Sequence, residues 1–261
     1  MRDNRINQVL ATGGIAVGTM NLEFSSSGVG RILAEAGADF CIFDMEHSGW
    51  GFETIRNAIA TTRCTEVVPF VRVPSVRYDA ISRALDVGAM GLVLPLVNDA
   101  EQARIAVESA LYPPLGKRGC CFALAHDDYR WSDLAATMAH ANENVAIIAQ
   151  IETAVGLDNI EAIAATPGLS ALWMGQFDLS ASLGIPGQFD HPKMQAASER
   201  LLAVCRVNGL AAVLASTDPA ELATGPTRGY SILVYLADLW IYQKALKAGF
   251  GAIRGHAIPV A

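Results

Sequence analysis

Residues 39–47 read Asp39-Phe40-Cys41-Ile42-Phe43-Asp44-Met45-Glu46-His47, an apolar run that stops abruptly at charged side chains. A continuous apolar run of this length is typical of a parallel strand that is covered on both faces. A helical pattern follows over residues 51–61. This stretch therefore predicts one strand–helix unit whose strand ends in polar groups.

The same unit recurs along the chain. Candidate strands occupy residues 15–21, 39–44, 67–72, 91–96, 145–151, 171–175, 211–214 and 231–236. Candidate helices occupy residues 28–36, 51–61, 78–87, 100–110, 156–165, 194–208, 219–228 and 238–248. Eight strands, each followed by a helix, predict an α/β fold of the (β/α)8 TIM-barrel type. A doubly wound open sheet is the alternative, and it is disfavoured because no GxGxxG or GxxxxGK[ST] loop is present.

The chain length fits a single barrel. TIM barrels have about 250 residues, and this chain has 261 with no linker or shift in composition. We therefore expect one domain over residues 1–261. The longest irregular stretch, residues 112–144, follows the fourth strand, and we expect it to lie over the carboxyl ends of the strands, where active sites of barrels lie.

Composition argues against several classes of partner. The 19 Lys and Arg against 26 Asp and Glu give a net charge of -7, which disfavours nucleic-acid binding. No apolar run reaches the roughly 18 residues of a membrane span, and residues 1–7 lack the apolar run of a signal peptide. The five scattered cysteines suit a reducing compartment. We expect a cytoplasmic protein with no membrane or nucleic-acid partner.

Polar residues gather where the candidate strands end. Parallel strands of a barrel all end at one mouth, so Arg72, Glu152 and Asp178 are expected to converge there with His47. Two buried carboxylates are costly without a cation, and hard divalent cations such as Mg²⁺ prefer oxygen ligands. Glu152 and Asp178 are therefore candidate metal ligands. Arg72 can bind a substrate carboxylate, and His47 is the best-placed general base.

Each of these residues also has an ordinary explanation. A single acid just past a strand is often a helix cap, as Asp178 could be, and Arg72 could be an exposed loop residue. Their joint occurrence at four strand ends favours a site over four independent coincidences. No lysine ends a candidate strand, which argues against a Schiff-base mechanism.

The chain resembles the HpcH/HpaI family of class II, metal-dependent 2-oxo-acid aldolases. The matching motifs occur in family order over residues 18–191 and read Phe43-Asp44-Met45-Glu46-His47, Val71-Arg72-Val73-Pro74, Leu85-Asp86-Val87-Gly88-Ala89, Tyr112-Pro113-Pro114-Leu115-Gly116-Lys117-Arg118-Gly119, Gln150-Ile151-Glu152-Thr153 and Gly175-Gln176-Phe177-Asp178-Leu179-Ser180.

The resemblance implies an activity and an assembly. It implies a carbon–carbon lyase that cleaves or forms 4-hydroxy-2-oxo acids, giving pyruvate or a related 2-oxo acid plus an aldehyde. The implied cofactor is a divalent metal ion, Mg²⁺, Mn²⁺ or Co²⁺. The implied architecture is a TIM barrel whose C-terminal helix is exchanged between subunits of a homohexamer, a trimer of dimers.

The resemblance also assigns roles to residues. Glu152 and Asp178 look like the metal ligands, and Gln150 looks like a neighbour of that site. Arg72 looks like the residue that holds the oxo acid and stabilises its enolate. His47 looks like the base, acting through water. Two carboxylates complete the catalytic set: Asp86, which resembles the one that orients His47, and Asp44, a further acid nearby.

The remaining positions concern the substrate. The residues expected to contact the substrate are Arg72, Gln150, Gly175, Gln176 and Phe177. Many family members read Gly-Pro-Ala-Asp-Leu-Ser where this chain has Gly175-Gln176-Phe177-Asp178-Leu179-Ser180, and many have a tryptophan in the first strand where it has Met20-Asn21-Leu22. These departures concern the pocket for the second substrate.

Two other functions remain open from the sequence. One is a CoA-ester lyase or decarboxylase that works through a metal-bound enolate on the same barrel, although no convincing basic cluster for CoA phosphates is present. The other is a non-catalytic barrel that binds oxo acids. The His47–Asp86 pair argues against the second, because a binding module has no need of a base.

Overall fold

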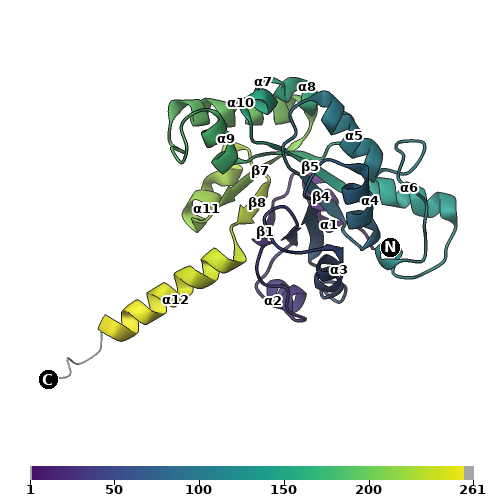
Figure 1. Cartoon of the computed structure of the whole chain (residues 1–261), viewed down its shortest axis with the longest axis horizontal. Coiled ribbons are helices and arrows are strands. Elements are labelled where there is room, and N and C mark those ends of the chain that lie inside the picture. The colour runs from purple at the N-terminus through teal and green to yellow at the C-terminus, as the bar shows by residue number, and fades with distance from the viewer. Residues whose placement is uncertain (1, 256–261) are drawn as a thin grey trace.

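The computed structural model describes residues 2–255, and it confirms the predicted (β/α)8 barrel (Figure 1). All neighbouring strands pair in parallel, and β8 closes the barrel against β1. Each strand begins at its predicted first residue or one residue after it. The strands are β1 (Ala16–Asn21), β2 (Phe40–Asp44), β3 (Val68–Arg72), β4 (Gly91–Leu94), β5 (Ala146–Ile151), β6 (Ala171–Met174), β7 (Ala211–Ser216) and β8 (Ile232–Tyr235).

Side chains of each strand alternate between two cores. In β2, Phe40 and Ile42 point into the barrel, whereas Cys41 and Phe43 pack outward against the helices. Both sets are fully buried, which explains why the strands read as continuous apolar runs. The barrel interior is therefore packed, and only its carboxyl end remains open for a site.

The helices that follow the strands form the outer layer. They are α2 (Val29–Glu35), α3 (Phe52–Ala60), α4 (Tyr78–Asp86), α5 (Ala100–Ala110), α7 (Ala154–Asp158), α8 (Ile160–Ala164), α9 (Gln176–Ser182), α10 (Pro192–Asn208) and α11 (Pro219–Arg228). The predicted helix at 156–165 is interrupted, because α7 ends at Asp158 and α8 begins at Ile160. The short helix α9 is missing from the candidate helices, although the possible capping role of Asp178 implied a helix there; Asp178 lies inside its first turn, and Gly175 is the N-cap.

An additional helix, which was not predicted from the polar N-terminal sequence, covers the amino ends of the barrel strands. Helix α1 (Arg5–Ala11) buries Ile6 completely among the interior residues of the strands. The side-chain amide of Asn4 donates hydrogen bonds to the carbonyl oxygens of Met90 and Asn144 at 2.9 and 2.8 Å, which ties α1 to the amino ends of the strands.

The prediction for residues 112–144 was wrong in two respects. The segment contains a 3₁₀ turn, η1 (Ala125–Asp127), and the helix α6 (Leu134–Asn144). It also lies away from the carboxyl ends of the strands, because it follows α5, which has already returned the chain to their amino ends. Arg63, in the turn between α3 and β3 at that same end, binds the carboxylate of Asp128 at 2.9 Å.

The last helix leaves the barrel. Helix α12 (Asp238–Gly255) is longer than the predicted 238–248, extends away from the body in Figure 1, and has no buried residue. The outer face of β1, where an eighth helix would pack, leaves Val17 44% exposed. Within residues 2–255, no helix combines the length and the apolar character that a membrane span requires.

Candidate active site

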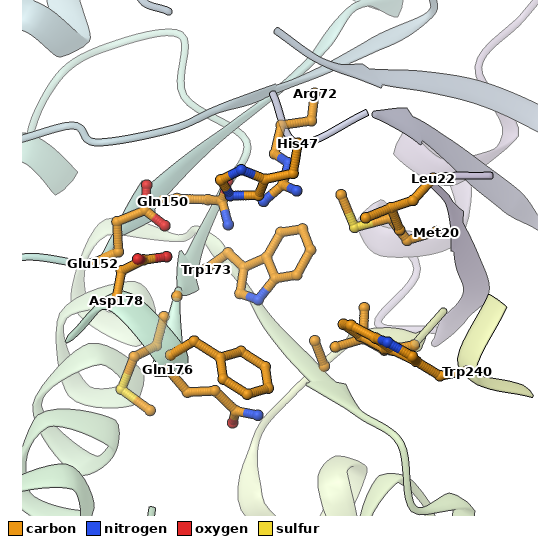
Figure 2. Close-up of a pocket in the computed structure, with 15 residues that line it drawn as sticks. Met20, Leu22, His47, Arg72, Gln150, Glu152, Trp173, Gln176, Asp178 and Trp240 are labelled. Atoms are coloured by element: carbon orange, nitrogen blue, oxygen red, sulfur yellow. The ribbon is translucent and has the colours of Figure 1, made fainter. Parts of the chain in front are cut away.

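A cavity of about 370 Å³ opens at the carboxyl ends of the strands (Figure 2). Most of the predicted site residues line it together, although they come from distant parts of the sequence. They are His47, Arg72, Gln150, Glu152, Gly175, Gln176, Phe177 and Asp178. The fold therefore brings the predicted site residues together at the carboxyl ends of the strands.

Arg72 is held by two acids. It is the last residue of β3 and lies opposite Asp44, the last residue of β2, in the strand register. Its Nε donates to Oδ1 of Asp44 at 2.6 Å, and its Nη1 lies 3.1 Å from Oε2 of Glu46. Asp44 is fully buried and also accepts the backbone N–H groups of Glu46 and His47 at 3.1 and 2.9 Å. Asp44 does not line the cavity, so its position suits orienting Arg72 rather than touching a substrate.

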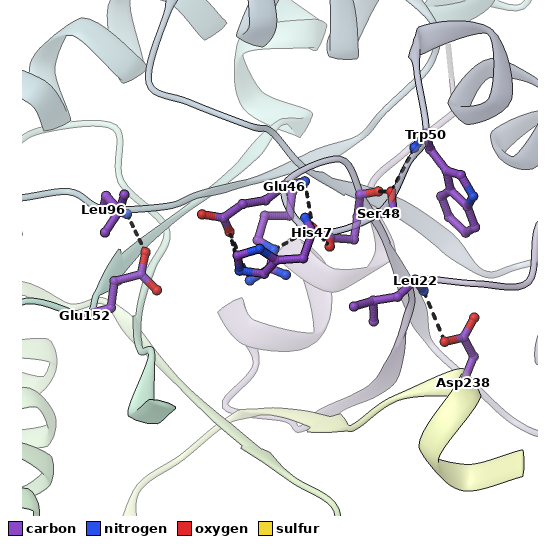
Figure 3. Close-up of polar contacts among 10 residues, drawn as sticks. Leu22, Glu46, His47, Ser48, Trp50, Leu96, Glu152 and Asp238 are labelled. Carbon is purple, nitrogen blue, oxygen red and sulfur yellow. Dashed lines mark hydrogen bonds and ion pairs between the residues drawn. The ribbon is translucent and has the colours of Figure 1, made fainter. Parts of the chain in front are cut away.

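His47 stands at the rim of the cavity. Its side chain is 57% exposed, and its Nε2 lies 3.7 Å from Oε2 of Glu46 (Figure 3). Burial raises the pKa of the Glu46 carboxyl, although the nearby Arg72 and His47 act in the opposite direction. An exposed imidazole beside an anchored carboxylate can exchange protons with a ligand in the cavity.

Glu152 follows β5 and is almost completely buried. Its Oε1 accepts the backbone N–H of Leu96 at 2.5 Å (Figure 3). Burial raises the pKa of Glu152 to about 7, and the neighbouring carboxylates of Glu46 and Asp178 add to the rise. Leu96 has a φ of 53°, in the left-handed region that costs a leucine roughly 1–2 kcal/mol. Its amide is thus held towards the acid at an energetic cost, a feature common at functional sites.

The glycine at position 175 makes room for Glu152. A Cβ built on Gly175 would lie 2.4 Å from Oε2 and 2.6 Å from Cβ of Glu152, closer than real contacts allow. Gly175 immediately precedes α9, whose third residue is Asp178. The missing side chain therefore lets Glu152, just after β5, and Asp178 of α9 share one side of the cavity, where both point inward in Figure 2.

The residues present fit a divalent cation. Glu152 and Asp178 place two carboxylates together, and the buried Oε1 of Gln150 has no hydrogen-bond partner among the described residues. Oxygen atoms of this kind are the ligands that hard cations prefer. Over residues 2–255, no three His, Cys, Asp or Glu side chains form a ready-made metal cluster. A cation here would thus complete its coordination with the amide, water or substrate oxygens.

The predicted pairing of Asp86 with His47 is not found within the chain. Asp86 is the last residue of α4, which runs from the carboxyl ends of the strands back towards their amino ends, so the helix carries it away from the cavity. Its Oδ1 instead accepts from Nη2 of the buried Arg118 at 2.8 Å.

Several residues of the site were missed by sequence reasoning. Glu46 lay within a quoted motif but received no role, and Leu96 carries no signal because its backbone amide, not its side chain, acts. The rest of the cavity wall is apolar, so a search for polar strand ends could not detect it. Its residues include Met20, Leu22, Trp173, Leu236 and Trp240.

Comparison with known proteins gives the chain its class. The family model for HpcH/HpaI aldolase/citrate lyase matches residues 22–225, and the chain belongs to this family. Aldolases and citrate lyases both cleave carbon–carbon bonds, so the predicted carbon–carbon lyase is confirmed.

Individual relatives are similar over most of their length. A 2-dehydro-3,6-dideoxy-6-sulfogluconate aldolase of Pseudomonas putida is 33% identical over 91% of this chain and 92% of its own. A 2-keto-3-deoxy-L-rhamnonate aldolase of Salmonella gallinarum is 32% identical over 86% of this chain and 84% of its own. The crystal structure of an HpcH/HpaI aldolase from Desulfitobacterium hafniense superposes with a TM-score of 0.93 at 31% identity, covering 97% of this chain and 98% of that one.

Proposed function

We propose that the chain catalyses reversible aldol cleavage of a 4-hydroxy-2-oxo acid to pyruvate and an aldehyde, with a divalent cation held by Glu152 and Asp178. The observation that carries this proposal is the convergence of two carboxylates, an arginine and an exposed histidine in one cavity. Both curated relatives are named as aldolases of 2-oxo-3-deoxy acids, which supports the same chemistry here.

Each residue has a task in the cleavage. His47 takes the proton of the 4-hydroxyl group, and C4 becomes the aldehyde carbon as the C3–C4 bond breaks. The electron pair of that bond stays on C3 as the enolate of pyruvate, which takes up a proton from solvent, and His47 releases the hydroxyl proton to solvent in turn. Arg72 lies beside the cavity as a fixed positive charge for the developing oxyanion. A bound Mg²⁺, Mn²⁺ or Co²⁺ supplies further positive charge for the keto and carboxylate oxygens.

The same geometry weighs against a CoA-ester lyase. Arg72 is the single Lys or Arg side chain among the described residues that line the cavity, and two acids already hold it. The phosphates of CoA would find no cluster of free cations there. The aldolase reaction therefore remains the function that the site supports best.

Assembly belongs to the same proposal. Helix α12 carries Trp240, Tyr242, Phe250 and Ile253 at 40–70% exposure, while β1 lacks a covering helix. An apolar helix of this kind is stabilised by a partner surface. We infer that subunits exchange α12 in a homo-oligomer, in line with the hexamer that the family resemblance implies.

The test is turnover with and without metal. Pyruvate release from a 4-hydroxy-2-oxo acid is measured after chelation and after addition of Mg²⁺, Mn²⁺ or Co²⁺. We expect activity to vanish on chelation and to return with at least one of these ions. The variant Glu152→Gln keeps the shape of the side chain, and we expect it to lose metal-dependent activity by at least 100-fold. Full activity in the chelated enzyme would refute the proposal.

A further inference from the structure

The cavity has two chemically different sides. One side carries the polar and charged residues, whereas the other side is built from large apolar side chains (Figure 2). The polar and charged residues are Glu152, Asp178, Gln150, Arg72 and His47. These apolar residues come from the end of β1, from β6 and α9, and from the chain after β8. They are Met20, Leu22, Trp173, Phe177, Leu236 and Trp240.

The apolar side is held in place by the backbone. The carboxylate of Asp238, at the start of α12, accepts the backbone N–H of Leu22 at 3.1 Å (Figure 3). It also accepts the backbone N–H groups of Glu23 and Phe24 at 3.0 and 2.8 Å. The loop after β1 is thereby fixed to the segment that carries Trp240. These hydrogen bonds therefore fix Leu22 relative to the segment that carries Trp240, and both side chains line the apolar side of the cavity.

None of the described residues that build this side carries a positive charge. Among the described residues that line the cavity, Arg72 is the only Lys or Arg, and Asp44 and Glu46 already hold its guanidinium. Gln176 is polar but neutral, so it can accept or donate one hydrogen bond without balancing an anion. A carboxylate, sulfonate or phosphate on the far end of a substrate would lose part of its hydration against these apolar side chains with no cation to pair with, which is unfavourable.

We propose that the aldehyde partner, and hence the distal end of the 4-hydroxy-2-oxo acid, carries a hydrocarbon side chain, aliphatic or aromatic, without an anionic group. The inference rests on the proposed function, because it assumes that the oxo-acid half occupies the acidic side. The bond made or broken is the same C3–C4 bond, and only the substituent on C4 is assigned.

The experiment has two arms on the metal-loaded enzyme. The first follows exchange of the methyl protons of pyruvate for deuterium in D₂O by NMR with no aldehyde present, which reports enolate formation alone. The second compares kcat/KM for aldol addition of pyruvate to propanal, hexanal, benzaldehyde, succinic semialdehyde and glyceraldehyde. We expect hexanal and benzaldehyde to exceed succinic semialdehyde and glyceraldehyde at least tenfold. Along the aliphatic series we expect about fourfold per added methylene until the cavity is full.

A matched pair of variants connects the preference to the wall. Leu22→Asn keeps the number and branching of the side-chain heavy atoms but presents an amide, and we expect the ratio of hexanal to succinic semialdehyde to fall about fivefold. Leu115→Asn makes the same exchange at a side chain that is 62% exposed and remote from the cavity, and it should leave the ratio and pyruvate exchange unchanged.

The two arms distinguish a failure of the proposed function from a failure of the aldehyde assignment. Absence of pyruvate exchange with every metal would overturn the proposed function, and the aldehyde assignment with it. Normal exchange combined with equal or faster reaction of the anionic or hydroxylated aldehydes, or with no reaction of the apolar ones, would overturn the aldehyde assignment alone. An unchanged ratio in Leu22→Asn would also contradict it.

Discussion

Asp44 contributes to the site without entering the cavity. Its two oxygens bind Arg72 and the backbone of residues 46 and 47, so one buried carboxylate sets both the cation and the loop that carries the base. The sequence could identify Asp44 as an acid at a strand end. It could not show that Arg72 lies directly opposite, because that depends on the register between β2 and β3. The distinction between touching and orienting a substrate needed the structure.

A single substitution tests this orienting role. Asp44→Asn leaves Arg72 without its buried partner, and we expect the free energy of unfolding to fall by about 3 kcal/mol. We also expect kcat/KM to fall about 100-fold, because a displaced Arg72 no longer meets the oxo acid. Urea denaturation and the aldolase assay measure the two effects.

The control is the exposed ion pair of Arg77 and Asp79, whose side chains are 71% and 59% exposed. Asp79→Asn should change stability by less than about 1 kcal/mol and leave activity intact. Equal effects of the two substitutions would contradict the orienting role.

Among the secondary-structure elements, the strands were the most predictable. Their apolar runs are unbroken because both faces are buried, and the polar residues mark their ends. The segment between α5 and α6 was misplaced because its sequence does not reveal at which end of the barrel a helix delivers it. Asp86 was misassigned for the same reason, since it ends α4 on that side. Both wrong predictions, for residues 112–144 and for Asp86, arose because the direction of the preceding helix decides the end of the barrel at which a residue lies.

The misplaced segment carries a buried histidine that predicts a pH effect. Burial, together with the nearby Arg118, lowers the pKa of His126, while Asp127 and Asp86 oppose the shift. Below the unfolded-state pKa of about 6.5, the unfolded chain binds a proton that the folded chain does not. Folding stability is therefore present above that pH and is lost as the pH falls towards the lower folded-state pKa.

We expect the melting temperature of the wild type to fall more steeply between pH 7.5 and 5.5 than that of His126→Gln. Differential scanning calorimetry across this range makes the comparison. The informative quantity is the slope, since the variant can melt lower at every pH simply because it packs less well. Parallel slopes would contradict the assignment.

At the scale of the whole molecule, the outer layer of the single chain is open beside β1. Helix α12 buries none of its residues and β1 keeps an open outer face, so the outer layer of the barrel lacks its eighth helix (Figure 1). The apolar character of this helix was visible in the sequence. Its direction was not, because the same pattern suits a helix packed on its own barrel.

We expect Ile253→Glu to weaken assembly. Ile253 is 70% exposed on α12, and a charge there would oppose burial in a partner. Sedimentation velocity should show the wild type as an oligomer and the variant shifted towards single chains. Val207→Glu, at an apolar side chain that is 83% exposed on α10, is the control and should leave the sedimentation coefficient unchanged. A wild type that sediments as one chain would rule out helix exchange.

The close approach of Gly175 to Glu152 also limits how enzymes of this kind can diverge. Any side chain at position 175 would collide with the acid, including its Cβ, so that position is closed to variation while the two strands keep their spacing. Its neighbours Gln176 and Phe177 meet no such barrier, and Phe177 is 53% exposed. Evolution can therefore reshape this wall of the cavity at positions 176 and 177, whereas position 175 has to remain glycine for as long as Glu152 keeps its place.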